Sequence, residues 1–201
     1  MDDRITQITS ALTQVADDAR VSFGGLTSDQ LNWKPSEKDW SVAQCLEHVV
    51  KTNHEFDAEF VKLANGTRKN SFWENYSPFS GWAGRFLAGV VSNDAKKAKA
   101  PTPRIVPPSD IGGDIVERFV AEIDEVNGIV EACDGVDLEK TVVTSPFLAV
   151  FTYKLDDALT VLVEHSKRHV RQAKRVMVSE GFPVSVERTT PSAAAAATPP
   201  L

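Results

Sequence analysis

LDDALTVLVEHSKRHVRQAKRVMVSEG, residues 155–181, decides the fold because it predicts one long amphipathic helix that carries two of the chain's four histidines. Its apolar or small residues recur at intervals of three and four, the pattern of a single buried helix face. The residues of that face are Leu155, Leu159, Leu162, Ser166, Val170, Ala173 and Met177. We therefore expect this helix to supply a large share of the core.

His165 and His169 lie on one flank of the predicted helix. At 100° per residue, His169 falls about 40° and His165 about 80° from the centre of the apolar face. Residues four apart have Cβ atoms roughly 6 Å apart, so two imidazoles in this spacing can converge on one ion. A coincidental pair of half-buried histidines is an equally good interpretation of this helix alone, and a metal site needs a further ligand from elsewhere.

Composition indicates one globular domain. The chain has 201 residues, of which 42% are hydrophobic and 25% charged, and we predict a helical domain over 1–182 followed by a low-complexity, disordered tail over 183–201. The net charge of −6 argues against a general polyanion binder and disfavours nucleic acid as a partner. The basic residues of the last helix are a local exception.

The first twenty residues mix acidic and spaced apolar residues, whereas a signal peptide needs a basic start and a continuous apolar run. No stretch approaches the roughly 20 apolar residues of a membrane span, so we expect a cytoplasmic protein without a membrane partner. Cys45 and Cys133 are far apart and in no CxxC pattern, which indicates neither a thiolate zinc site nor a disulfide framework.

Three further long helices are predicted by apolar spacing, over 3–23, from Trp40 or Ser41 to Gly66, and over 110–132 with a cap near Ser109 or Asp110. A short helix is expected over 80–92. The apolar run VVTSPFLAVF, residues 142–151, could be extended, but a single strand cannot make a sheet. The predicted fold class is therefore all-α: a four-helix bundle with an extra short helix.

The second long helix holds the other two histidines. His48 lies roughly 100° from the centre of its apolar face, whereas His54 lies roughly 140° away on the other side. We therefore choose His48 as the inward candidate and interpret His54 as a solvated surface residue. Cys45, one turn before His48, is interpreted as a buried core thiol.

An aromatic cluster follows that helix. We interpret most of its members as a packed cover over the bundle; the alternative is the wall of a substrate pocket. They are Phe72, Trp73, Tyr76, Phe79, Trp82 and Phe86.

Two segments carry a family resemblance. LNWKPSEKDWSVAQCLEHV (31–49) and EHSKRHVRQ (164–172) resemble, in order and separation, the two signature segments of the DinB-like superfamily, also called the DinB/YfiT-like metalloenzyme fold. The resemblance covers most of residues 5–180. It implies a bundle of up-down-down-up topology.

The resemblance also implies that His48, His165 and His169 bind a divalent metal ion, with zinc or nickel expected. Three neutral imidazoles leave at least one coordination position open, as in catalytic rather than structural sites. Gln172 matches a glutamine of the family pattern and would hydrogen-bond a histidine or a metal-bound water. Glu47 and Glu164 each neighbour one of these histidines, but consecutive helix residues point about 100° apart, so we do not expect an HExxH protease.

Relatives in the superfamily include enzymes that use bacillithiol or mycothiol. The resemblance therefore implies an enzyme that acts on a small molecule, either a thiol-dependent S-transferase or isomerase or a metal-assisted hydrolase. The S-transferase or isomerase would use a low-molecular-weight thiol as cofactor. The resemblance also implies a homodimer. No catalytic residue is identified beyond the metal ligands. The alternative is a noncatalytic helical module that binds metal or another protein.

Overall fold

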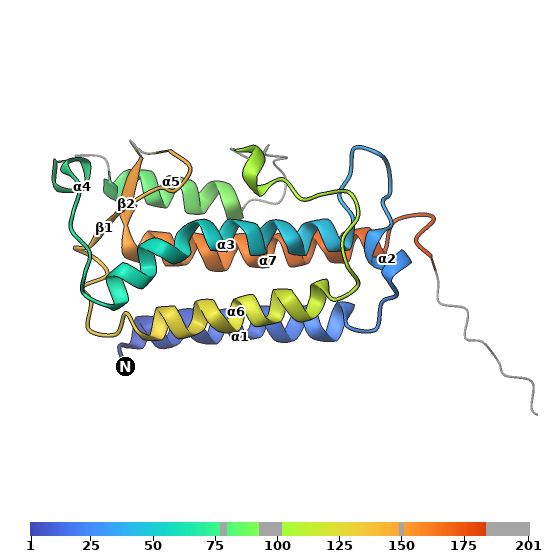
Figure 1. Cartoon of the computed structure of the whole chain (residues 1–201), viewed down its shortest axis with the longest axis horizontal. Coiled ribbons are helices and arrows are strands. Elements are labelled where there is room, and N and C mark those ends of the chain that lie inside the picture. Colours follow the sequence, from blue (N-terminus) through green and yellow to red (C-terminus); the bar gives the residue numbers. More distant parts are fainter. Residues whose placement is uncertain (77–79, 93–101, 149–150, 184–201) are drawn as a thin grey trace, which may run out of the picture.

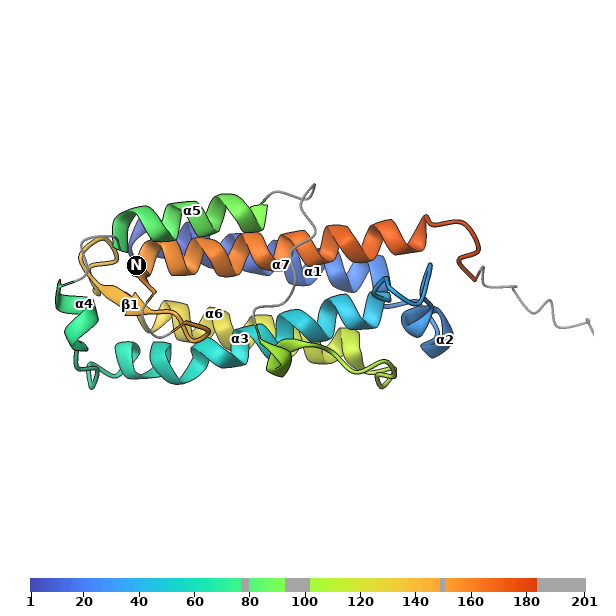
Figure 2. The ribbon, with the colours of Figure 1, turned by 90° about the horizontal axis from the view of Figure 1, so that it is seen from above.

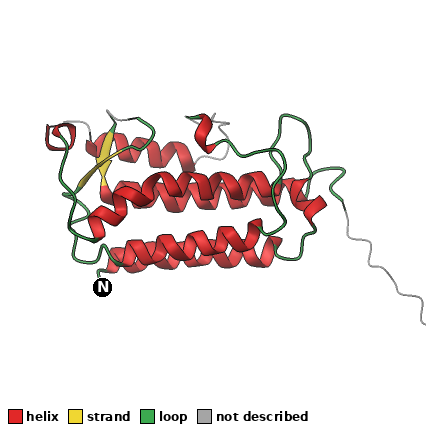
Figure 3. Ribbon diagram, viewed as in Figure 1, coloured by secondary structure: helices red, strands yellow, loops and turns green. Residues whose placement is uncertain are grey.

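The computed structural model describes residues 1–76, 80–92, 102–148 and 151–183. These residues are mostly helical, with one small pair of strands (Figure 3), which confirms the all-α class. The predicted tail lies outside the described residues except for Pro183. Its disorder and the boundary of the domain therefore stay predictions.

Four long helices form the body of the molecule: α1 (Asp3–Phe23), α3 (Val42–Ala64), α6 (Ile115–Glu131) and α7 (Leu155–Met177). Helices α1 and α3 each pack against both α6 and α7, so the four enclose one apolar core. Figure 1 shows α1 and α7 running in one direction and α3 and α6 in the other. The apolar faces predicted for these helices are largely buried, from Ile5 in α1 to Ala173 in α7, whereas Met177 at the end of α7 is half-buried.

Local signals explain where α3 begins. Ser41 caps the helix: its side chain accepts from the backbone N–H of Gln44, whose side chain accepts from the N–H of Ser41 in return. This capping box places Trp40 just before the first turn. The predicted start at Trp40 or Ser41 is therefore confirmed.

The start predicted for α6 is wrong by one turn. Asp114, not Ser109 or Asp110, precedes its first residue, Ile115. Gly112 and Gly113 lie in between, and glycine is costly inside a helix, which favours a later start.

The statement that the 142–151 run cannot belong to a sheet is also wrong. Strand β1 (Val142–Thr144) pairs antiparallel with β2 (Thr152–Lys154), and Val143 lies opposite Tyr153. Both of these side chains are buried. The partner strand β2 has no recognisable sequence pattern because it is only three residues long and runs directly into α7.

Shorter helices complete the fold: α2 (Ser28–Asn32), α4 (Phe72–Tyr76), α5 (Ser80–Ser92) and the 3-10 turn η1 (Pro103–Ile105). Helix α5 confirms the short helix expected over 80–92, and it packs on the outside of α7 and β2 (Figure 2).

The aromatic cluster is less buried than a packed cover would be. Phe72, Trp82 and Phe86 expose 68%, 61% and 55% of their surface, which overturns that interpretation for these three. The side chains of Trp73, Tyr76 and Phe79 lie outside the described part. None of the described helices combines the length and the apolarity that a bilayer crossing needs.

Candidate metal centre

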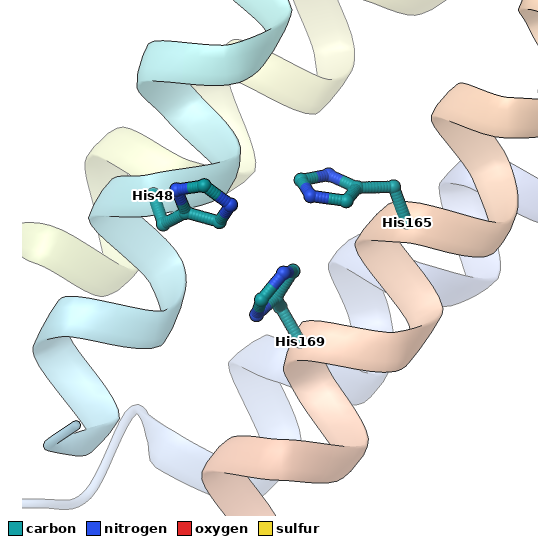
Figure 4. Close-up of side chains that lie close together, drawn as sticks. All are labelled: His48, His165 and His169. Atoms are coloured by element: carbon teal, nitrogen blue, oxygen red, sulfur yellow. The ribbon is translucent and has the colours of Figure 1, made fainter. Parts of the chain in front are cut away.

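Three histidines from two helices converge between α3 and α7. One potential ligand atom from each of His48, His165 and His169 lies within 4.8 Å of the other two. The ring centroids are 5.1 Å apart for His48 and His165, 4.6 Å for His48 and His169, and 4.5 Å for His165 and His169. Figure 4 shows the three rings pointing toward one another across the gap between the helices. The structure thus brings together all three residues chosen from the sequence.

The local sequence of α7 explains how its two rings reach this position. His165 and His169 are one turn apart, and Ser166 between them is fully buried, with its hydroxyl donating to the carbonyl oxygen of Leu162 in the same helix. A small residue on the packed face lets α3 and α7 approach, so the flanking imidazoles meet the one from α3.

The ring of His48 is held by the main chain of η1. Its Nδ1 lies 2.7 Å from the carbonyl oxygen of Ile105, and because a carbonyl only accepts, this nitrogen carries the proton and donates. The lone pair is therefore on Nε2, which is the nitrogen available to a metal. Sequence reasoning missed Ile105, since a main-chain carbonyl leaves no signature in residue type.

The two rings from α7 keep buried nitrogens without partners. Nδ1 of His165 and Nδ1 of His169 are both buried and accept or donate no hydrogen bond. A buried polar atom without a partner is costly, so these atoms fit a site that an ion completes. The side chain of Gln172 hydrogen-bonds His169, which is one of the two contacts that the sequence predicted for it.

Burial also keeps the three imidazoles neutral. Desolvation is the main cause that lowers the pKa of each ring: that of His165 falls to about 3, and those of His48 and His169 fall below the usual value of 6.5. Mutual repulsion among the rings and the nearby positive charge of Arg168 lower the pKa of His165 and His169 further. Neutral imidazole is the form that binds metal, so no proton needs to leave at pH 7.

Trp40 covers one side of the cluster. Its ring centroid lies 4.8 Å from that of His48 and 5.7 Å from that of His169, with an interplanar angle of 29° in the second case. The sequence analysis named Trp40 only as a possible start of the second long helix. Its contact with both helices' histidines adds an apolar wall to the centre.

The acidic neighbours of these histidines are engaged elsewhere. Glu47 accepts from Arg118 of α6 at 2.9 Å, and Glu164 pairs with Lys167 at 3.0 Å. Neither carboxylate has its ligand atoms in the cluster, which agrees with excluding an HExxH protease. Cys45 is fully buried as predicted, and burial raises the pKa of its thiol far above the usual range, so it stays protonated.

His54 does not belong to this cluster. It is exposed over 56% of its side chain, as predicted, but its Nε2 lies 2.7 Å from Oε2 of the buried Glu122, a partner that the sequence analysis did not foresee.

The basic residues of α7 are also partly engaged within the molecule. Lys174 pairs with Asp18 of α1 at 2.5 Å, and Arg168 donates to the carbonyl oxygens of Val90 and Val91 at the end of α5. Together with the pair of Lys167 and Glu164, these contacts place three basic side chains of α7 against partners within the molecule.

Comparison with known proteins adds one finding. No curated protein and no solved structure matches the chain. The family model of the DinB superfamily matches residues 11–173, most of the 201 residues and all three converging histidines, and the chain therefore belongs to the DinB superfamily.

Proposed function

We propose that this DinB-superfamily protein binds a divalent metal ion through His48, His165 and His169 and uses it in an enzymatic reaction on a small molecule. The observation that carries the proposal is the convergence of three neutral imidazoles, two of which keep a buried nitrogen without a partner. Imidazole ligands suit zinc and nickel, which are the ions we propose.

Three protein ligands are characteristic of catalytic rather than structural zinc sites, because a position stays open for water or substrate. Such an ion, when bound, lowers the pKa of a coordinated thiol or water and so provides a nucleophile at neutral pH. Contacts within the described part of the chain would support this chemistry by orienting the ligands: the Ile105 carbonyl orients His48, Gln172 hydrogen-bonds His169, and Trp40 packs over both rings.

The positive charge of Arg168 supports an anionic substrate. It acts on all three histidines, so its field reaches the centre of the cluster. A carboxylate-bearing thiol would be attracted by it. We therefore propose a thiol-dependent S-transferase or isomerase, with a low-molecular-weight thiol as cofactor, in preference to a hydrolase. We also propose that the protein is a cytoplasmic homodimer.

A noncatalytic metal-binding or protein-interaction module is the second candidate. Its support is the burial of the ligands, since His48 and His169 expose only 5% and 7% of their surface. A buried centre suits a structural ion as well as a catalytic one.

Elemental analysis of full-length protein purified without a nickel column tests the metal site. Wild type should contain a divalent metal ion as purified or bind added zinc. His165→Ala should not bind an ion at this cluster. Ser166→Ala is the matched control, because it changes the neighbouring buried side chain of α7 and removes no imidazole.

Wild type that neither contains metal nor binds added zinc or nickel would refute the proposal. For a loaded protein, thiol-transfer and hydrolysis assays distinguish the two candidates: turnover that depends on His165 supports the enzyme, and a metal-loaded protein inactive on both substrate classes supports the module.

A further inference from the structure

A second group of metal-ligating side chains lies between α3 and α6. His54 and Asp57 of α3 and Glu122 of α6 each offer one ligand atom, and the three atoms lie within 4.8 Å of one another. Nε2 of His54 and Oε2 of Glu122 are 2.7 Å apart. His54 and Asp57 are three residues apart, so they share one face of the helix.

This group is separate from the three-histidine cluster. Asp57 follows His48 by nine residues in the same helix. At about 100° per residue this is two full turns plus roughly 180°. Asp57 therefore lies on the side of α3 opposite His48. The two groups share no residue.

Glu122 is a buried carboxylate with an unused oxygen. The residue exposes 5% of its surface, and Oε1 has no hydrogen-bond partner although Oε2 of the same carboxylate contacts His54. Asn53, one turn before Asp57 on the same face of α3, exposes 1%, and both polar atoms of its amide are also without partners. Buried polar atoms without partners are rare in folded proteins because each costs free energy.

Negative charge accumulates around this carboxylate. Burial raises the pKa of Glu122 to about 7; the charge of His54 opposes this, while Asp57 and Glu125 raise the pKa further. Burial likewise raises the pKa of Asp57. A cation held between these carboxylates would offset that repulsion.

We propose that His54, Asp57 and Glu122 form a second divalent-cation site that links α3 to α6. Two carboxylates and one imidazole form a harder ligand set than three imidazoles, and it suits Mn²⁺ better than the other cluster does. Asn53 offers an amide oxygen on the same helix face. The site stands on its own geometry and does not depend on the function proposed for the histidine cluster.

Electron paramagnetic resonance of added Mn²⁺ tests the site, because the signal of free Mn²⁺ falls as the ion binds. The full-length, metal-free His165→Ala protein, in which the histidine cluster is broken, should bind about one Mn²⁺ per chain. Adding Asp57→Asn should raise the dissociation constant at least tenfold, since a charged ligand is lost. Asp124→Asn is the matched control, because this exposed carboxylate of α6 is outside the group, and it should leave the constant unchanged.

His54→Ala provides an independent variant. Its side chain is largely exposed, so its removal spares the core, and it should weaken Mn²⁺ binding as Asp57→Asn does. Absence of Mn²⁺ binding to folded His165→Ala protein and wild type, or equal binding by the Asp57, His54 and Asp124 variants, would overturn the proposal. Since the readout is Mn²⁺ bound to protein without the histidine cluster, failure of the first site leaves this test intact.

Discussion

Nδ1 of His48 donates to the carbonyl oxygen of Ile105 at 2.7 Å, so a main-chain atom of η1 orients one of the three converging histidines. Ile105 itself is buried, exposing 2% of its surface, and its packing holds the carbonyl in place. Ile105→Ala should therefore weaken zinc binding roughly 10–100-fold, the usual effect of losing a group that orients a ligand.

Competition with a chromophoric chelator measures this affinity. Ile105→Val keeps most of the side chain and is the matched control, with an affinity near that of wild type. If the two variants bind zinc equally, the η1 carbonyl does not orient His48 in solution.

Most of the candidate site was predictable because its signals are side-chain patterns on helices. His165 and His169 follow from the one-turn spacing, and the choice of His48 over His54 follows from the angular position of each on α3. The structure brings the three chosen residues together, and the all-α class follows from the same apolar periodicity.

What could not be predicted depends on tertiary contacts. The Ile105 carbonyl belongs to a segment far from His48 in sequence, and any residue type could have supplied it. The contact of Glu122 with His54 depends on the rotation of α6 against α3, which helical periodicity alone leaves open. The hairpin was missed because strands of three residues carry too little pattern to separate them from a linker.

A buried ion-pair network ties the end of α3 to α4 and β1. Arg68 pairs with Glu59 and with Glu74, the latter at 2.5 Å, and donates to the carbonyl oxygen of Val142 at 2.7 Å. The side chains of Arg68 and Glu74 are only 6% and 4% exposed. Arg68→Met would leave the buried Glu74 carboxylate without its cation, whereas Glu59 keeps Lys62, and it should lower the free energy of unfolding by about 3–5 kcal/mol.

Urea unfolding of the metal-free protein measures this loss. Arg68→Lys is the control that keeps the charge and loses the fork-shaped set of donors, and its cost should be smaller. Solvent-exposed ion pairs contribute at most about 1 kcal/mol. If Arg68→Met lowers the free energy of unfolding by no more than this amount, the network is not buried.

Glu74 should make part of the stability depend on acid pH. Burial acts to raise the pKa of its carboxyl, but hydrogen bonds from Ser71 and Thr144 and the charge of Arg68 outweigh burial and hold that pKa below its ordinary value of 4.5. The folded state therefore binds fewer protons than the unfolded state, so the contribution is present above pH 4.5 and is lost as the pH falls through the lowered pKa.

Comparison of wild type with Glu74→Gln isolates this contribution. The difference in unfolding free energy should be largest near pH 7 and should shrink steadily between pH 5 and pH 3. A difference that does not change with pH would mean that the negative charge of Glu74 contributes nothing to the free energy of unfolding.

Gly84 allows α5 to lie against the first turn of α7. A Cβ atom added at Gly84 would overlap the side chain of Asp157, whereas one added at Gly89, further along the same helix, would meet no atom within 4 Å. Alanine favours helix over glycine by about 1 kcal/mol, so Gly89→Ala should stabilise the protein by up to that amount. Gly84→Ala should instead destabilise it by about 1–3 kcal/mol, because α5 must move away from α7. Thermal unfolding of both variants provides the comparison, and an equal stabilisation by the two substitutions would show that α5 does not pack on α7 at this point.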